Sequence, residues 1–402
     1  MKKTLFIAAV SAFALAAMTV AAPALADGRD RNSPPRPGSP VTLTDGLISP
    51  LSLAVQRDGT AYTTQNFIGQ LTRVTRDGTA SVAASAPGQE LSAVSERNGT
   101  VYYAQNAMDH SSSALMEMKD GGAPTPLADL WAYENSENPD QINTYGFEGL
   151  PQSCADQFDA SAPPFLPASY TGTIDTHAYG SVALDDAVYV ADAGANAILR
   201  VGYDGTVSTT AVLPPADPVV ATADVVAQFG FPACAAGHDY RFEPVPTDVE
   251  LGPDGWLYVS SLPGGPESAA LGARGSVVKI DPDSGEIVKV ASGFVGTTGL
   301  AVSPTSGTVY VAELFGGPTG TGQISVVKRG ASTPTVLMAL SSPAAIELRS
   351  GSLYVTTDAF VPDATGNPQP IGKVTIVPLR GSGSSEDCDD PGHGNHGGNG
   401  HA

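Results

Sequence analysis

Positive charge is scarce in this sequence, and its scarcity limits the partners that the protein can take. Twenty Lys and Arg residues face 41 Asp and Glu residues, which gives a formal net charge of −21 at pH 7. A surface this acidic repels the phosphates of nucleic acids and of anionic membranes. We therefore expect a soluble, monomeric protein without a nucleic-acid partner.

Long apolar runs are also rare, because only residues 5–22 form one. The basic residues Lys2 and Lys3 precede this run, and the small-residue cleavage signal Ala24-Leu25-Ala26 follows it. This order predicts a signal peptide over residues 1–26 and a secreted, extracellular product that is not inserted in a membrane after cleavage. An N-terminal membrane anchor is the alternative interpretation of the same residues.

Cysteine occurs only three times, and no two cysteines are close enough in the sequence for a typical zinc motif. Cys154 and Cys234 lie in two long irregular segments that can meet, and an exported protein encounters oxidising conditions. We predict a disulfide between these two residues. Cys388 is then free or linked to another molecule.

A repeated unit is the main positive feature of the sequence. Two short β-rich runs, joined by a turn pair such as Asp58-Gly59 or Asn98-Gly99, occur six times. Such pairs tolerate the positive φ of tight hairpins. A third run, and in most units a fourth, completes a four-stranded antiparallel unit that is typical of a propeller blade. The second run carries a tyrosine at the same position in every unit: Tyr62, Tyr102, Tyr189, Tyr258, Tyr310 and Tyr354.

The sequence therefore predicts an all-β, six-bladed β-propeller over residues 41–380. Its last unit has only three runs before a Gly- and Ser-rich segment begins at residue 381, whereas residues 41–45 resemble the fourth run of other units. We predict that this N-terminal strand completes the last blade beside residues 373–378. The pairing would hide two sheet edges that otherwise invite aggregation.

Two insertions, near residues 131–176 and 214–246, explain the uneven spacing of the repeated tyrosines. A helical turn is expected at residues 219–228 of the second insertion. A degenerate seventh blade within the first insertion is the alternative. Residues 27–40 are interpreted as a Pro-rich linker, and residues 381–402 as a flexible tail rich in Gly and His.

Several motifs of the third and fourth units resemble a known family. Tyr189-Val-Ala-Asp-Ala-Gly-Ala-Asn196 resembles NHL-type propeller repeats. Together with Asp175-Thr-His-Ala-Tyr-Gly180, Val245-Pro-Thr-Asp-Val-Glu-Leu-Gly-Pro-Asp-Gly255 and Leu262-Pro-Gly-Gly-Pro266, it resembles the ScyD/ScyE family of secreted propellers, over nearly all of residues 41–380. That family is named for proteins encoded beside genes for the pigment scytonemin. The resemblance implies export and a propeller fold, and it implies no defined activity or catalytic residues.

The position three residues after each repeated tyrosine is polar in all six units. These side chains end the second strand near one rim of the ring, where they could line the central channel and hold Ca²⁺ or a small polar ligand. The alternative is that they bond turn backbone within or between blades. No other cofactor is expected. The acidic members are Asp192 and Glu313, and the others are Gln65, Gln105, Ser261 and Thr357.

A second group of ligand-binding candidates lies in and just after the first insertion. His177 could act as a base beside Asp175, or as a ligand. An internally hydrogen-bonded loop is the alternative. This group is the main site hypothesis, and its members are Asn138, Asp140, Glu148, Asp175, His177 and Tyr179.

The tail carries a third candidate, a weak metal site made by His393, His396 and His401. The intervening glycines argue against a preformed site. Disorder without a specific role is the alternative.

We therefore expect a non-catalytic propeller that presents its loops to a small molecule, a glycan or a protein. A funnel-site enzyme, such as a metal-dependent lactonase, a lyase or a quinoprotein dehydrogenase, is the alternative. An accessory role in pigment biosynthesis rests on the family name alone. Carboxylates that converge on the axis would favour a metal enzyme, whereas a channel lined by small apolar residues would favour a binding protein.

Overall fold

The computed structural model describes residues 35–380, except 120, 160, 162–166, 266–270 and 318–319. The expected signal peptide, Cys388 and the three tail histidines lie outside the described residues. Within them, no helix is long and apolar enough to cross a membrane.

Five sheets each contain four strands that follow one another in the chain and pair antiparallel. The first sheet consists of β3 (Leu53–Val55), β4 (Ala61–Gln65), β5 (Gln70–Val74) and β6 (Ala80–Ser85). The second consists of β7 (Gln89–Arg97), β8 (Thr100–Ala107), β9 (Ser113–Lys119) and β10 (Thr125–Asp129). The third consists of β13 (Ala178–Ala183), β14 (Ala187–Asp192), β15 (Ala197–Gly202) and β16 (Val207–Val212). The fourth consists of β19 (Pro246–Leu251), β20 (Leu257–Ser261), β21 (Gly275–Ile280) and β22 (Ile287–Phe294). The fifth consists of β23 (Thr297–Val302), β24 (Val309–Glu313), β25 (Gln323–Val327) and β26 (Thr335–Ala339).

The sixth sheet combines the two ends of the described chain. Its strands β27 (Ile346–Arg349), β28 (Ser352–Thr357) and β29 (Gly372–Arg380) are joined by β2 (Val41–Leu47) and β1 (Arg36–Pro37). Both N-terminal strands pair antiparallel with β29, with Val41 opposite Ile376 and Leu47 opposite Gly372. The expected pairing of residues 41–45 with the last unit is therefore confirmed, and the unexpected β1 extends the same sheet.

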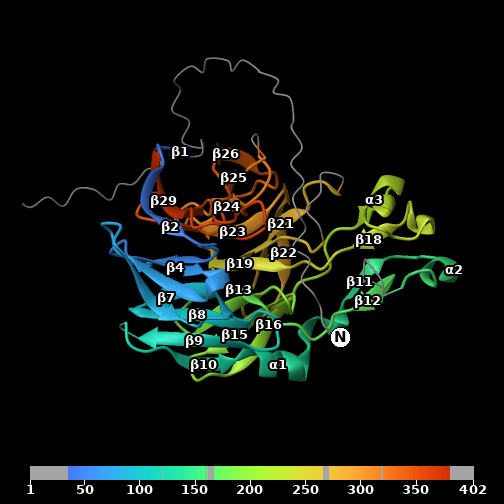
Figure 1. Cartoon of the computed structure of the whole chain (residues 1–402), viewed down its shortest axis with the longest axis horizontal. Coiled ribbons are helices and arrows are strands. Elements are labelled where there is room, and N and C mark those ends of the chain that lie inside the picture. Colours follow the sequence, from blue (N-terminus) through green and yellow to red (C-terminus); the bar gives the residue numbers. More distant parts are fainter. Residues whose placement is uncertain are drawn as a thin grey trace, which may run out of the picture.

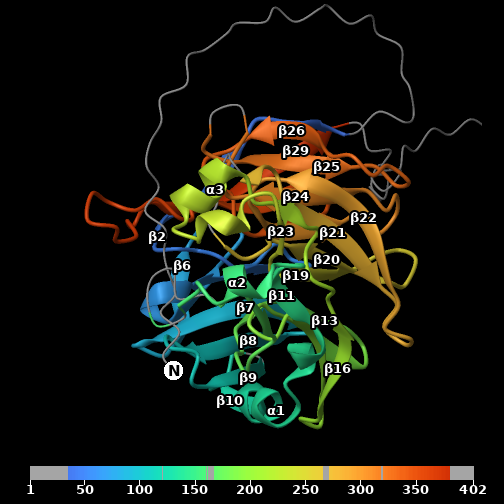
Figure 2. The same ribbon diagram turned by 90° about the vertical axis from the view of Figure 1, so that its right-hand side faces the viewer.

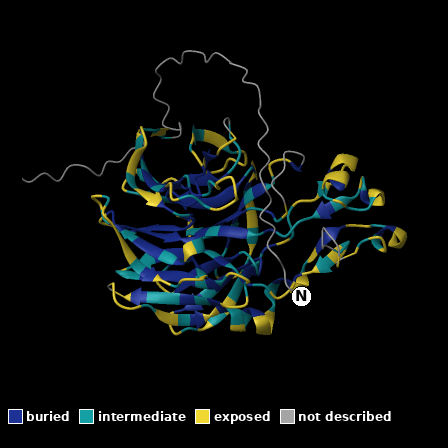
Figure 3. Ribbon diagram, viewed as in Figure 1, coloured by how far each residue is buried: buried dark blue, intermediate teal, exposed yellow. Residues whose placement is uncertain are grey.

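The first strands of these six sheets contact one another in the cyclic order β3, β7, β13, β19, β23, β27 and back to β3. Figure 2 shows the sheets arranged around a common centre. Each neighbouring pair of sheets shares an apolar cluster, such as Leu71, Leu91 and Met118 between the first and second sheets. Buried residues accordingly dominate the strands, and exposed residues gather at the turns (Figure 3).

A further sheet belongs to the two insertions. It contains β11 (Thr144–Phe147) and β12 (Ser169–Thr171) from the first insertion, and β17 (Val219–Val220) and β18 (Asp239–Arg241) from the second, in the order β12-β11-β18-β17. We name it the inserted sheet. Figure 1 shows it projecting from the ring, and Figure 2 shows it in front of the centre of the ring. The sequence did not predict this sheet, because each insertion supplies only half of it.

Short helices accompany these sheets. They are α1 (Leu130–Glu137), α2 (Gln152–Ala155), α3 (Ala223–Gln228), and the 3₁₀ helices η1 (Asn66–Ile68), η2 (Pro139–Ile142) and η3 (Ala233–Ala235). The helix α3 begins four residues later than expected, because β17 occupies the start of that segment. The predicted disulfide between Cys154 and Cys234 is present, and it joins the two insertions beside an apolar cluster that includes Phe147 and Tyr240.

Candidate functional site

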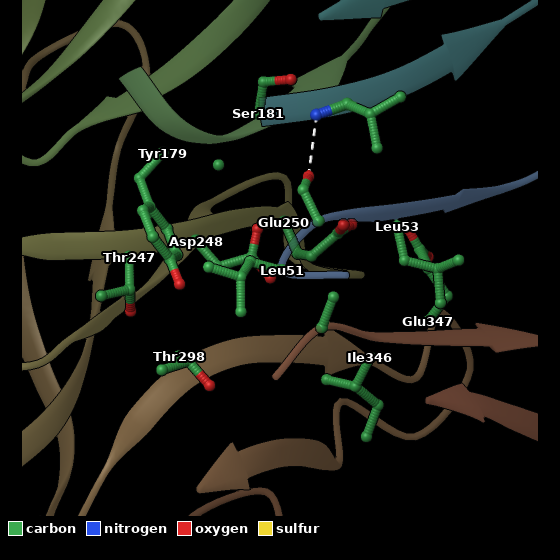
Figure 4. A pocket seen from close by; sticks show the side chains of 14 residues that line it. Leu51, Leu53, Tyr179, Ser181, Thr247, Asp248, Glu250, Thr298, Ile346 and Glu347 are labelled. Atoms are coloured by element: carbon green, nitrogen blue, oxygen red, sulfur yellow. Dashed lines mark hydrogen bonds between the residues drawn. The ribbon is translucent and has the colours of Figure 1, made fainter. Parts of the chain in front are cut away.

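A small cavity lies among the first strands of the sheets. Its volume is about 10 Å³, which is room for one water-sized group. Figure 4 shows its side chains, which come from β3, β7, β13, β19, β23 and β27 or from the residues just before these strands. We name it the axial cavity. Its polar lining consists of Ser52, Ser181, Thr247, Thr298, Asp248, Glu250 and Glu347.

Most of these polar groups bond the first strand of the next sheet. Ser52 Oγ accepts from the Val94 amide at 2.8 Å, and Asp248 Oδ2 accepts from the Leu300 amide at 2.9 Å. The hydroxyl of Thr298 donates to a carbonyl of the neighbouring segment in the same way, at 2.9 Å. These bonds join first strands that have no backbone ladder between them. Their primary effect is therefore to close the ring.

Glu250 and Glu347 differ from the other polar groups, because neither carboxyl group has a hydrogen-bond partner among the described residues. Burial raises the pKa of Glu347 to about 8, repulsion from Asp248 adds to this rise, and Arg349 opposes it. Burial also raises the pKa of Asp248 to about 7 and holds the pKa of Glu250 well above its usual range. In neutral solution burial therefore favours the protonated, uncharged forms of Glu250 and Glu347.

One end of the axial cavity is covered by aromatic side chains. Phe67, Tyr179, Phe315 and Phe360 are partly buried and pack against a cluster that contains Leu51. Leu51 and Tyr179 also line the axial cavity, so this aromatic cluster lies at its end. The rings of Phe67 and Phe360 meet edge to face, with centroids 6.3 Å apart. We name this end the aromatic mouth.

Two stacked histidines lie beside the aromatic mouth. The ring centroids of His110 and His177 are 4.6 Å apart, and the His177 ring meets Tyr179 edge to face at 5.9 Å. His110 Nδ1 lies 2.8 Å from Asp175 Oδ1, and His177 Nε2 lies 2.9 Å from Glu90 Oε2. His177 and Asp175 thus each contact a side chain of the second sheet, and Asp175 also contributes to the raised pKa of His177.

The His177–Glu90 contact is an ion pair in neutral solution. Burial alone would lower the pKa of His177, but the attraction of Glu90 and its hydrogen bond outweigh this effect and raise the pKa to about 9. The same contact lowers the pKa of Glu90 against the opposing effect of burial. A protonated imidazole neither accepts a proton nor binds a metal. His177 is therefore suited to donate a hydrogen bond and not to act as a base.

The structure places the other candidates of the first insertion as follows. Asp140 accepts from Asn196 Nδ2 at 2.8 Å and from the Tyr145 hydroxyl at 3.1 Å. Asn138 ends α1 with a φ of 41°. Glu148 is exposed and pairs with Arg241 in the inserted sheet.

The polar positions three residues after the repeated tyrosines do not line the axial cavity. Asp192 accepts from the His177 amide at 2.7 Å, and Glu313 Oε2 accepts from the Val295 amide at 2.6 Å. In both cases the carboxylate holds the segment that leads into its own sheet. The alternative interpretation, in which these side chains bond nearby backbone, describes what the structure shows for these two residues.

Sequence reasoning missed several residues of the site, namely Glu90, His110, Asp248, Glu250, Glu347, Phe67, Phe315 and Phe360. A signal existed for the axial glutamates, because the fourth residue of the first run is Glu in two units and Ala or Val in the other four. A charged residue at a position that is buried elsewhere indicates a channel-facing site. No local signal indicated the histidine pair, because His110 lies between two strands of the second sheet and His177 lies just before the third sheet.

No family model matches this chain, and no curated protein matches it. Solved structures do match it. A gluconolactonase from Xanthomonas campestris is 12% identical, with a TM-score of 0.50, over 86% of this chain and 95% of that chain. The PQQ-bound aldose sugar dehydrogenase from Streptomyces coelicolor is 15% identical, with a TM-score of 0.51, over 87% of this chain and 100% of that chain.

A structural genomics protein of unknown function from Bacteroides thetaiotaomicron is 11% identical, with a TM-score of 0.52, over 85% of this chain and 76% of that chain. Identities this low carry no information about activity. These similarities therefore show the fold alone: the chain is an all-β protein of antiparallel four-stranded sheets that resembles β-propellers.

Proposed function

We propose that this chain is a secreted, six-bladed propeller of the ScyD/ScyE type that binds a small organic molecule at the aromatic mouth without converting it. One observation carries the proposal. Tyr179 of the third sheet and three phenylalanines that follow the second strands of the first, fifth and sixth sheets pack together at the end of a cavity that is too small for a substrate. Partly buried rings of this kind offer apolar faces to a ring-shaped or aliphatic ligand.

The size of the axial cavity supports binding at the mouth instead of within the channel. Small-molecule sites typically enclose about 300–1,000 Å³, whereas the axial cavity holds about 10 Å³. The protonated His177 next to Tyr179 can supply a hydrogen-bond donor to a polar group on the ligand. The inserted sheet lies in front of the ring centre and would limit the size of the ligand (Figure 2).

The charge states argue for binding without catalysis. A general base must be deprotonated near the working pH and within reach of the ligand. Burial raises the pKa of Glu250 and Glu347 and so favours their protonated forms, and the Glu90 carboxylate raises the pKa of His177 to about 9. Glu250, Glu347 and His177 are therefore better suited to donate hydrogen bonds to a ligand than to abstract a proton from it.

A funnel-site enzyme is the second candidate, because three carboxyl groups line the axial cavity. Oxygen ligands of this type suit Ca²⁺. Among the described residues, no group of three His, Cys, Asp or Glu side chains has the arrangement needed to hold a metal ion. Such an enzyme would need Glu250 and Glu347 to move and ionise when metal binds.

The test compares ligand binding by the parent, Phe360→Ala and Val336→Ala, where Val336 is an exposed control on β26. Small aromatic and sugar compounds are screened by thermal shift, and hits are quantified by calorimetry. We expect Phe360→Ala to weaken binding about tenfold, which corresponds to roughly 1.4 kcal/mol, and Val336→Ala to leave it unchanged. Equal affinities in all three proteins would contradict binding at the aromatic mouth.

Two further measurements separate the candidates. Hydrolysis of a sugar lactone that falls in Glu250→Gln would contradict the non-catalytic proposal and support the enzyme. N-terminal sequencing of protein collected outside the cell checks the cleavage after Ala26. A first residue other than Asp27 would correct that boundary.

A further inference from the structure

Glu134 is a buried carboxylate that lacks a counter-charge. The residue is fully buried in α1. Its Oε1 accepts a 3.3 Å hydrogen bond from the Asp175 amide, and its Oε2 has no hydrogen-bond partner within the described part of the chain. A carboxylate withdrawn from water without a cation or enough donors destabilises a fold by several kcal/mol. This oxygen therefore needs a proton or a cation.

The surroundings of Glu134 are acidic. Burial, followed by repulsion from Asp192, raises the pKa of Glu134 to about 8, and Asp140 and Asp175 add to the rise. The surrounding sequence contains no Lys or Arg from residue 120 to residue 199, whereas it contains twelve Asp and Glu residues. The field at Glu134 thus favours a positive ion.

A second acceptor without a donor lies one helical turn further on. The amide of Asn138 donates to the Glu134 carbonyl at 2.8 Å, and its Nδ2 donates to the Gly172 carbonyl at 3.2 Å. Its buried Oδ1 has no partner in the described residues. Helix C-termini carry partial negative charge from their free carbonyls. Two oxygens that lack donors therefore lie near the C-terminus of α1.

We propose that Glu134 and Asn138 bind a Ca²⁺ ion at the junction between the first insertion and the ring. Calcium takes six to eight oxygen ligands and accepts carboxylate, amide, carbonyl and water oxygens together. This suits a site in which few side chains are charged. The smaller Mg²⁺ requires a stricter octahedral set.

The position of the site gives the ion a structural role. The helix α1 follows β10 of the second sheet, and Asp175, whose amide bonds Glu134, lies three residues before β13 of the third sheet begins. The segment between Asp175 and β13 carries His177. A bound ion would therefore hold both ends of the first insertion and, with them, the histidine pair. This role is independent of the ligand proposed for the aromatic mouth.

The experiment measures calcium binding by the chelator-treated full chain. Calcium chloride is titrated by calorimetry, and the melting temperature is recorded with and without calcium at constant ionic strength. We expect calcium to raise the melting temperature of the parent and of Glu137→Gln, an exposed control on the same helix. We expect Glu134→Gln to weaken calcium binding at least tenfold.

A second variant keeps the proposal testable if Glu134→Gln does not fold. Asn138→Asp retains the shape and the left-handed backbone and adds charge at the proposed ligand oxygen, so we expect it to bind calcium several-fold more tightly. The proposal is overturned if calcium has no effect on the parent, or if Glu134→Gln responds as the parent does. It is also overturned if Glu347→Gln abolishes the response and Glu134→Gln does not, because the ion would then lie in the axial cavity.

Discussion

Replacing Glu347 by glutamine should change how the stability of the ring depends on pH. The pKa of Glu347 rises from an ordinary value of 4.5 to about 8 on folding. The folded state therefore binds this proton more tightly than the unfolded state does. Stability falls as the pH rises from about 4.5 to about 8 and then levels off, because both states are ionised above the folded pKa. Glutamine has no proton to lose, so the variant should lack this part of the fall.

The structure sets the size of the effect. Each pKa unit is worth about 1.4 kcal/mol, so the difference between 4.5 and about 8 gives a ceiling of about 5 kcal/mol. Glu347 is only partly buried, and it shares the cavity with Asp248 and Glu250, so water and proton sharing reduce this figure. We expect Glu347→Gln to be more stable than the parent by about 1–2 kcal/mol at pH 8, and to match it near pH 4.5.

The assay is urea unfolding followed by circular dichroism between pH 5 and pH 9. The control is Glu286→Gln, which removes a charge from an exposed position in the turn before β22. Parallel pH profiles for the parent and Glu347→Gln would refute the reasoning, because they would mean that Glu347 titrates as it does in water. Added calcium provides a further check. If calcium stabilises the parent at pH 8 and not Glu347→Gln, the carboxyl groups of the axial cavity bind metal, and the enzyme candidate gains support.

Three further predictions concern closure, the insertions and the histidine pair. Deletion of residues 40–46 removes most of β2 and exposes β29, so we expect aggregation or a melting temperature lower by about 10 °C or more; an unchanged melting temperature would exclude a closure role. Cys154 and Cys234 are separated by 80 positions in the sequence, and replacing both by serine should lower the free energy of unfolding by at most about 4 kcal/mol. Proteolysis of this variant should then cut the insertions before it cuts the ring. Loss of the ring at the same rate would show that the parts unfold together. Glu90→Gln removes the ion pair, so NMR titration should show the pKa of His177 falling from about 9 toward 6.5. The parent loses the stability that this ion pair provides as the pH rises through about 9, whereas the variant should lack that stability at lower pH as well. A His177 pKa that stays near 9 in the variant would assign the shift to other groups.

The strands were predictable because their signals are local. The turn pairs, the repeated tyrosines and the β-rich runs lie within segments of about 40 residues, and each run was expected from its own composition. The pairing of β2 with β29 could also be predicted, because a unit with three runs needs a fourth strand from elsewhere in the chain. The disulfide followed from two cysteines in neighbouring insertions. In each case, the number of strands or cysteines left few possible pairings.

The candidate site was less predictable because its contacts cross between sheets. Glu90 and His177 are 87 residues apart, and His110 and Asp175 are 65 residues apart. Nothing near Asp175 in the sequence indicates that it pairs with His110 instead of the closer His177. For the polar residues that end the second strands, the position could be predicted but the role could not. Their positions were evident from the repeat, but their role depends on the backbone amides of the preceding segment, which have no sequence signature.

The inserted sheet explains why the candidate residues of the insertions could not be placed from sequence. Its four strands contain two to four residues each, and strands that short are unstable without partners. Neither insertion can form the sheet alone, since β11 from the first insertion pairs with β18 from the second. The disulfide and the cluster around Phe147 hold these halves together, and α1 and Asp175 fix the first insertion to the ring. The geometry in front of the aromatic mouth is thus set by contacts between segments that are far apart in sequence. A change at any one of these contacts, such as loss of the disulfide or of the hydrogen bond between Asp175 and Glu134, should therefore alter the mouth before it alters the ring.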